Sequence, residues 1–98
     1  MIPKRNPIHP GEILREEFLT PLKISQSALA EKLGIPLQRI NEVCTGKRGI
    51  TPETAWMLSG AFGNSSQFWM NLQTMYDLSR TRANFKRLPG LIKRIAIQ

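Results

Sequence analysis

The sequence has very few of the residues that crosslink a chain or bind a metal ion. It contains one cysteine, Cys44, and one histidine, His9. A single cysteine excludes an intramolecular disulfide, so we expect Cys44 to be a small packing residue and His9 to lie at the entry of a helix. The sequence also lacks a paired nucleophile and base and a phosphate-binding glycine loop. We therefore expect no metal, no cofactor and no enzymatic activity.

Long hydrophobic runs are also missing. No stretch of about 18 apolar residues occurs, so a membrane span is not expected. Residues 1–10 carry charge and three prolines but no apolar segment, which argues against a secretory signal. The simplest expectation is a cytoplasmic protein.

Acidic residues are half as numerous as basic ones. The chain has 14 lysines and arginines against 7 aspartates and glutamates, a formal net charge of +7. This excess favours a polyanionic partner, nucleic acid before an anionic membrane surface. Residues 80–98 hold six basic residues and no acidic one. For them several interpretations stay open: a solvated or disordered tail, an arm on DNA, a segment that orders on a protein partner, or a short membrane-surface segment.

Prolines and glycines, seven of each, divide the chain into short elements. Its 98 residues fit one domain. Pro10 suits the first turn of a helix over 11–19, which Pro21 is expected to end. Capping residues predict four further helices. These run from Ser25 to Gly34, from about Pro36 to Gly46, from Thr51 to Gly63, and onward from Ser65 or Ser66. No convincing strand pattern precedes residue 80, so the expected fold class is all-α.

The most specific pattern lies in residues 26–45, which have the register of a helix-turn-helix. With Gln26 as the first of twenty positions, the fifth is Ala30, where two helices cross and only a small side chain fits. The ninth is Gly34, where the turn requires a positive φ angle. The five positions that should be apolar are Leu29, Leu33, Ile35, Ile40 and Val43. All seven constraints are met together, whereas a two-helix corner without DNA binding would satisfy only several of them.

The second helix of such a unit enters the major groove, where its outward side chains meet base edges. Gln38 and Asn41 have the amides that bond adenine through two hydrogen bonds, and Arg39 can do the same to guanine or reach a phosphate instead. Leu37 suits a thymine methyl group. Thr45 also lies on the outward face.

Three further residues suit the DNA backbone. Gln26 opens the first helix of the motif, where its amide and the backbone N–H groups can hold a phosphate. Lys47 and Arg48 lie in the loop after the second helix, although a solvated basic loop is an alternative. The predicted DNA-binding residues are Gln26, Leu37, Gln38, Arg39, Asn41, Thr45, Lys47 and Arg48.

Three segments of the chain resemble the HigA/VapI antitoxins, within the XRE (lambda-repressor-like) helix-turn-helix superfamily. They begin with HPGEILREEFLTPLKISQSALAEKLGIP, continue with RINEVCTGKRGIT and end with FGNSSQFWMNLQTMYDL. The resemblance covers about residues 9–78. It implies a five-helix DNA-binding domain over residues 1–79, with a short basic C-terminal tail at 80–98 that matches the family less well.

The resemblance also implies a function. Such a protein represses its own operon as a homodimer on palindromic double-stranded DNA and neutralises a cognate mRNA-cleaving toxin protein. Two alternatives stay open: a stand-alone transcriptional repressor, and a protein-binding module that uses the helix-turn-helix as a scaffold. RNA binding ranks below these, since the narrow major groove of duplex RNA does not admit a recognition helix.

The aromatic residues of the last helix have two interpretations. Phe68, Trp69 and Tyr76 recur at helical spacing, which favours burial in the core over a dimer interface. An interface could still use Trp69 or Met70, because aromatic residues and methionine are common at interfaces.

Overall fold

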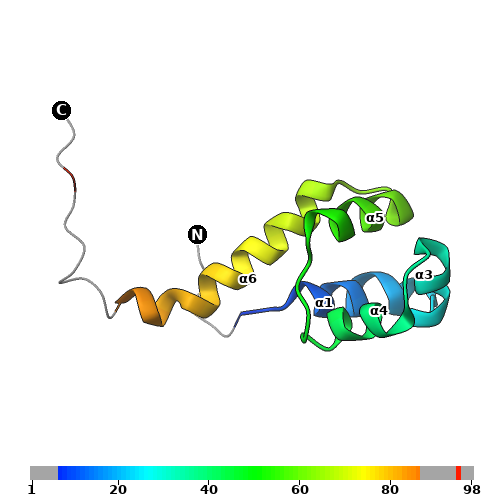
Figure 1. Ribbon diagram of the computed structural model, residues 1–98, viewed down its shortest axis with the longest axis horizontal. Coiled ribbons are helices and arrows are strands. Elements are labelled where there is room, and N and C mark those ends of the chain that lie inside the picture. Colours follow the sequence, from blue (N-terminus) through cyan, green and yellow to red (C-terminus); the bar gives the residue numbers. More distant parts are fainter. Residues whose placement is uncertain (1–6, 87–94, 96–98) are drawn as a thin grey trace.

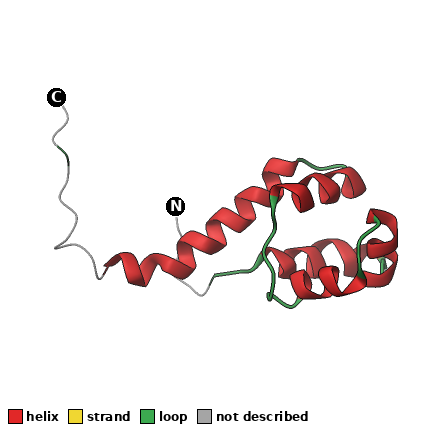
Figure 2. Ribbon diagram, viewed as in Figure 1, coloured by secondary structure: helices red, strands yellow, loops and turns green. Residues whose placement is uncertain are grey.

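The computed structural model describes residues 7–86 and residue 95. Every regular element in this part of the chain is a helix, as Figure 2 shows. Three segments, α1 (Pro10–Ile13), η1 (Leu14–Leu19) and α2 (Thr20–Leu22), follow one another without a break and form the first helix. Four separate helices follow, which confirms the expected five-helix all-α fold. They are α3 (Gln26–Leu33), α4 (Leu37–Cys44), α5 (Pro52–Phe62) and α6 (Ser66–Lys86).

The first helix runs past the proline that was expected to end it. It continues through Pro21 to Leu22, and Lys23 ends it with a left-handed backbone at φ 56°. Proline stops most helices because it has no N–H and its ring clashes with the carbonyl four residues earlier. Here η1 is a π-helix, whose hydrogen bonds span one residue more than those of an α-helix. This wider turn ends one residue before Thr20–Pro21, where the N–H of Thr20 still bonds five residues back to the carbonyl oxygen of Arg15. The altered path of the backbone relieves the usual clash, and the helix continues.

The expected helix caps are present. Ser25 Oγ accepts a hydrogen bond from the backbone N–H of Ala28 at 3.0 Å, and Thr51 Oγ1 accepts one from Thr54 at 3.3 Å. Ser65, one of the two candidate caps of α6, accepts from the N–H of Phe68. These side chains satisfy N–H groups that have no partner within their own helix.

The helix-turn-helix register is confirmed by the packing of α3 and α4. Gly34 has φ 70° and turns the chain between them. Ala30, at the helix crossing, is 4% exposed. Leu29, Ile40 and Val43 are buried in the core, and the other two apolar positions of the motif are partly buried against it.

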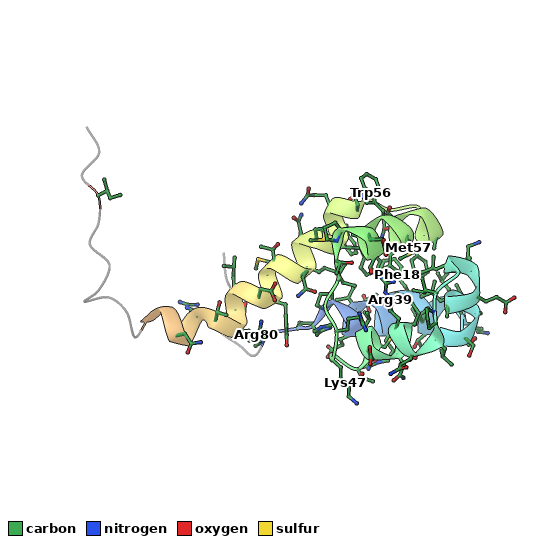
Figure 3. All side chains as sticks on the ribbon, viewed as in Figure 1. Phe18, Arg39, Lys47, Trp56, Met57 and Arg80 are labelled. Atoms are coloured by element: carbon green, nitrogen blue, oxygen red, sulfur yellow. The ribbon has the colours of Figure 1, made fainter. Side chains whose placement is uncertain are left out.

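The remaining core lies between the first helix, α5 and the start of α6. Trp69 is fully buried, as expected, and its ring centroid lies 5.1 Å from that of Phe18. Phe68 is 37% exposed, so the expectation that it too is a core residue is wrong. Trp56, on α5, is 70% exposed and points away from the body of the protein in Figure 3.

Helix α6 extends well beyond the other helices (Figure 1). It crosses the predicted domain limit between residues 79 and 80 and continues to Lys86. The predicted division into a DNA-binding domain over residues 1–79 and a basic tail over residues 80–98 stays a prediction. Most of the expected basic tail, residues 87–94 and 96–98, lies outside the described residues.

Two contacts place the first helix against α4. A Cβ on Gly11 would lie 1.7 Å from the carbonyl oxygen of Val43, so only glycine allows α1 to approach α4 this closely. The guanidinium of Arg15 donates a hydrogen bond to the carbonyl oxygen of Cys44 at 3.0 Å. This bond caps the last turn of α4, where a positive charge also suits the helix dipole. Both contacts hold α4 with one face outward.

Candidate nucleic-acid interface

The predicted DNA-binding residues lie around α4 and the loop that follows it. Leu37 is 47% exposed at the start of α4. Gln38, Asn41 and Thr45 are exposed along the same helix and at its end. The apolar residues of α4 other than Leu37 face the core instead, because Ile40 and Val43 are each 1% exposed. The result is a helix with one buried apolar side and one polar side open to solvent, as a helix in a DNA groove requires.

Gln26 joins this surface from the neighbouring helix. Its Oε1 accepts a hydrogen bond from Nδ2 of Asn41 at 3.2 Å. The bond connects the first residue of α3 to the middle of α4. The structure thus brings together two predicted site residues that are 15 positions apart in the chain.

The loop after α4 folds back onto that helix. The backbone N–H groups of Lys47 and Arg48 both donate to the carbonyl oxygen of Glu42, at 2.8 and 3.1 Å. The side chain of Lys47 points away from the body of the protein in Figure 3. From the other side of the loop, Gln73 of α6 accepts a hydrogen bond from the N–H of Ile50 at 2.6 Å. The loop is therefore held at both ends with its basic side chains exposed.

Glu42 occupies the middle of the exposed face and was not among the predicted site residues. Its Oε1 accepts from Nε and a terminal nitrogen of Arg48, at 3.0 and 2.9 Å. Its Oε2 accepts from Gln38 Nε2 at 3.3 Å. The spacing of Gln38 and Glu42 by four residues on one helix face is a signal that could have linked them. The pairing with Arg48 depends on the course of the loop.

These contacts affect the charge on Glu42. The hydrogen bond from Arg48 is the main cause that lowers the pKa of its carboxyl group below the ordinary value, and burial opposes it. Glu42 is therefore ionised at neutral pH and neutralises part of the charge of Arg48. An open hollow of about 300 Å³ lies here, lined by Pro36, Gln38, Arg39, Glu42 and Arg48.

Arg39 is the predicted site residue that the structure directs elsewhere. Its guanidinium donates to Glu53 Oε1 at 3.2 Å and to Thr54 Oγ1 at 3.1 Å, both in the first turn of α5. Only 25% of its side chain is exposed. In this conformation Arg39 connects α4 to α5 rather than extending from the exposed polar face of α4. A contact between Arg39 and DNA stays a prediction.

The two isolated residues lie in structural positions. Cys44 is buried, and burial raises the pKa of its thiol. His9 caps α1, since its Nδ1 accepts from the N–H of Gly11 at 2.9 Å. In the described residues, no group of three or more His, Cys, Asp or Glu side chains is placed to hold a metal ion. None of the helices in that same part combines the length and apolar character needed to cross a membrane.

Comparison with known proteins places this geometry among DNA-binding proteins. The helix-turn-helix family (HTH_3) matches residues 14–69. Virulence-associated protein I of Dichelobacter nodosus is 54% identical over 71 residues, which are 72% of this chain and 66% of that protein. Antitoxin HigA-1 of Vibrio cholerae is 36% identical over 90 residues, covering 92% of this chain and 85% of its own length.

A solved structure extends the likeness to three dimensions. The antitoxin HigA of Pseudomonas aeruginosa, solved with the higBA promoter, superimposes with a TM-score of 0.86 at 43% sequence identity. The match covers 92% of this chain and 99% of that one. The fold described above is thus similar to that of an antitoxin solved with promoter DNA.

Proposed function

Because this chain belongs to the helix-turn-helix family, among relatives that include the HigA antitoxins, we propose that it is the DNA-binding antitoxin of a toxin–antitoxin system. It binds a palindromic operator in front of its own gene and represses transcription. It also neutralises the toxin encoded beside it, which cleaves mRNA.

The exposed polar face of α4 is the observation that carries the DNA-binding part of this proposal. Gln38 and Asn41 have amide groups that suit base edges, and they lie on the side of α4 opposite its buried residues. Lys47 and Arg48 lie beside them on a loop anchored at both ends. Base-reading amides next to backbone-binding cations are the combination that specific DNA recognition requires.

The proposal includes binding as a homodimer. A palindromic operator repeats its half-site about one turn of DNA apart, roughly 34 Å, and two copies of α4 related by twofold symmetry read the two halves. A single copy would contact one half-site and leave the other unread. Saturation at two chains per palindrome is therefore part of the proposal.

The first experiment measures binding to the DNA upstream of the gene. Fluorescence anisotropy with the purified full chain, at two salt concentrations and with an unrelated duplex as competitor, separates specific from non-specific binding. We expect binding to the upstream duplex that resists the competitor and saturates at two chains per palindrome. Equal weak binding to both duplexes, abolished by salt, would show that charge alone drives the association.

The second experiment tests toxin neutralisation separately. The reading frame next to the gene is expressed with and without this chain, and cell growth and mRNA integrity are followed. Growth arrest with mRNA cleavage, relieved by this chain, is the expected result. Operator binding without any effect of the neighbouring frame would support a stand-alone repressor instead. Partner binding without operator binding would support a protein-binding module.

A further inference from the structure

Two amide side chains from different helices meet at the edge of the exposed polar face of α4, the surface proposed to contact DNA bases. Asn41 lies on the exposed side of α4, and Gln26 is the first residue of α3. Asn41 Nδ2 donates a hydrogen bond to Gln26 Oε1 at 3.2 Å. The two helices cross at the buried residue Ala30, so the distance between the amides is set by the packing of the motif.

This bond determines which hydrogen-bonding groups Asn41 can present. An asparagine amide has two N–H donors and one carbonyl oxygen as acceptor. The bond to Gln26 uses one N–H. One N–H and Oδ1 remain, in an orientation that the Gln26 contact selects, because the opposite orientation of the Asn41 amide would bring two carbonyl oxygens together.

We propose that Gln26 is a positioning residue that orients the amide of Asn41 to select adenine over guanine. In the major groove adenine presents an acceptor at N7 and a donor at its N6 amino group, whereas guanine presents acceptors at both N7 and O6. The remaining N–H of Asn41 matches N7, and Oδ1 matches the N6 amino group. On guanine, Oδ1 would face O6 and the two acceptors would repel.

Contact with the DNA backbone strengthens this arrangement. Gln26 uses its Oε1 toward Asn41, so both N–H donors of its own amide stay available. A phosphate oxygen only accepts hydrogen bonds, so a phosphate contact fixes the Nε2 group outward and the Oε1 group toward Asn41. The backbone contact and the base contact therefore form together. This inference rests on the proposed operator binding and adds a selected base to it.

The experiment uses the purified full chain and a library of duplexes with a randomised centre. Selection with the unaltered protein identifies the preferred half-site. Repeating the selection with Asn41→Ala shows which adenine depends on Asn41, because its enrichment is lost in that variant. Anisotropy then measures affinity for the selected duplex and for the same duplex with that adenine replaced by guanine. The ratio of the two affinities reports base selection, whereas a loss common to both duplexes reports contact with the backbone.

The expected results differ among the variants. The unaltered chain prefers adenine by about 5-fold to about 150-fold, the range for one two-bond contact, and Asn41→Ala removes this preference. Gln26→Ala lowers the ratio by at least about twofold, as expected for directly coupled residues, but leaves it unchanged when Asn41→Ala is already present. Gln26→Glu keeps an acceptor for Asn41 and loses the phosphate donors, so both affinities fall while the ratio is retained.

The matched control is Gln67→Ala on α6. Gln67 also belongs to an amide pair, donating to Asn71 Oδ1 at 2.8 Å, but this pair lies outside the helix-turn-helix. We expect it to leave both affinities unchanged.

Three outcomes would overturn the inference. A Gln26→Ala variant that binds both duplexes more weakly with an unchanged ratio would make Gln26 a backbone contact alone. If Asn41→Ala changes the preference for adenine at no position of the selected half-site, Asn41 does not read a base. If the unaltered chain enriches no sequence at all, the proposed operator binding fails, and the inference fails with it.

Discussion

At the residue scale, the two tryptophans lie in opposite environments. Trp69 is fully buried among aromatic rings, and its Nε1 donates a hydrogen bond to Asn64 Oδ1 at 2.9 Å. Trp56 is 70% exposed on α5. The same residue type therefore contributes to the core at one position and not at the other, which a pair of substitutions can measure.

We expect Trp69→Ala to lower the free energy of unfolding by about 3–5 kcal/mol, because it leaves a large cavity and an unpaired Asn64 side chain. Trp56→Ala is the control and should change it by no more than about 0.5 kcal/mol. Urea unfolding followed by circular dichroism measures both values. Similar losses in the two variants would contradict the burial of Trp69 and the exposure of Trp56.

His9 is a titratable residue whose protonation is coupled to the fold through a hydrogen bond with the backbone. Burial lowers the pKa of its imidazole below the ordinary value, and Asp77 opposes this shift. Nδ1 must be unprotonated to accept the hydrogen bond from Gly11. The ring also packs edge-on against Tyr76, with 4.8 Å between the centroids. A protonated His9 would lose its cap and place a positive charge at the positive end of α1.

The sign of the pH dependence follows from this shift. Since the pKa of His9 is lower in the folded chain than in the unfolded chain, its contribution to stability is complete above the unfolded pKa of about 6.5. That contribution is lost as the pH falls through the folded pKa. We expect the urea concentration at the midpoint of unfolding to fall as the pH is lowered from about 7 to about 5. In His9→Asn, which keeps a capping side chain that does not titrate, this part of the decline should disappear; an identical pH profile would exclude His9 as its source.

At the scale of the helices, α3 and α5 are each limited by local signals at both ends. Ser25 and Thr51 cap α3 and α5, and glycines with left-handed backbones follow both helices. The position of α4 depends on longer contacts, through Gly11 and Arg15 of the first helix. Local caps thus define where the helices begin and end, while contacts between helices set how α4 is presented.

The cap of α3 can be tested by substitution. Ser25→Ala removes the acceptor for the Ala28 N–H and should lower the free energy of unfolding by about 1 kcal/mol. The control is Ser27→Ala, an exposed serine in the first turn of the same helix that is not its cap. Thermal or urea unfolding of the two variants gives the comparison. If Ser27→Ala costs as much as Ser25→Ala, capping is not the cause.

At the scale of the whole molecule, charge is the property that matters for DNA. The net charge of +7 attracts any polyanion. Close to α4, part of the positive charge is neutralised, because Glu42 pairs with Arg48 and Glu53 pairs with Arg39. Lys47 lies in the same region, exposed on the loop that follows α4. A local contact by Lys47 can be distinguished from the general effect of net charge.

We expect Lys47→Ala to reduce the slope of log affinity against log salt by about one unit, as the loss of one phosphate contact predicts. Arg80→Ala removes the same charge from α6, outside the helix-turn-helix (Figure 3), and should leave the slope nearly unchanged. Operator binding at four or more salt concentrations measures the slopes. Equal changes in both variants would indicate an effect of net charge rather than a contact.

The sequence by itself determined the five helices, most of their limits and the helix-turn-helix. Capping side chains, left-handed glycines and the spacing of apolar residues act within a few positions of the chain, so Ser25, Gly34 and Ile40 are readable without coordinates. The family resemblance was readable for the same reason, since its motifs are short and continuous. The exception within this range was Pro21, because the π-helical turn before it removed the clash that proline normally causes.

Only the tertiary structure decided how the site residues are paired. It turned Arg39 toward Glu53, joined Asn41 to Gln26 and placed Arg48 on Glu42. Two of these contacts cross between helices and the third depends on the return of a loop. Their geometry follows from the packing of Gly11, Ala30 and the core, which positions whole elements, and no short sequence pattern specifies the resulting distance between two side chains.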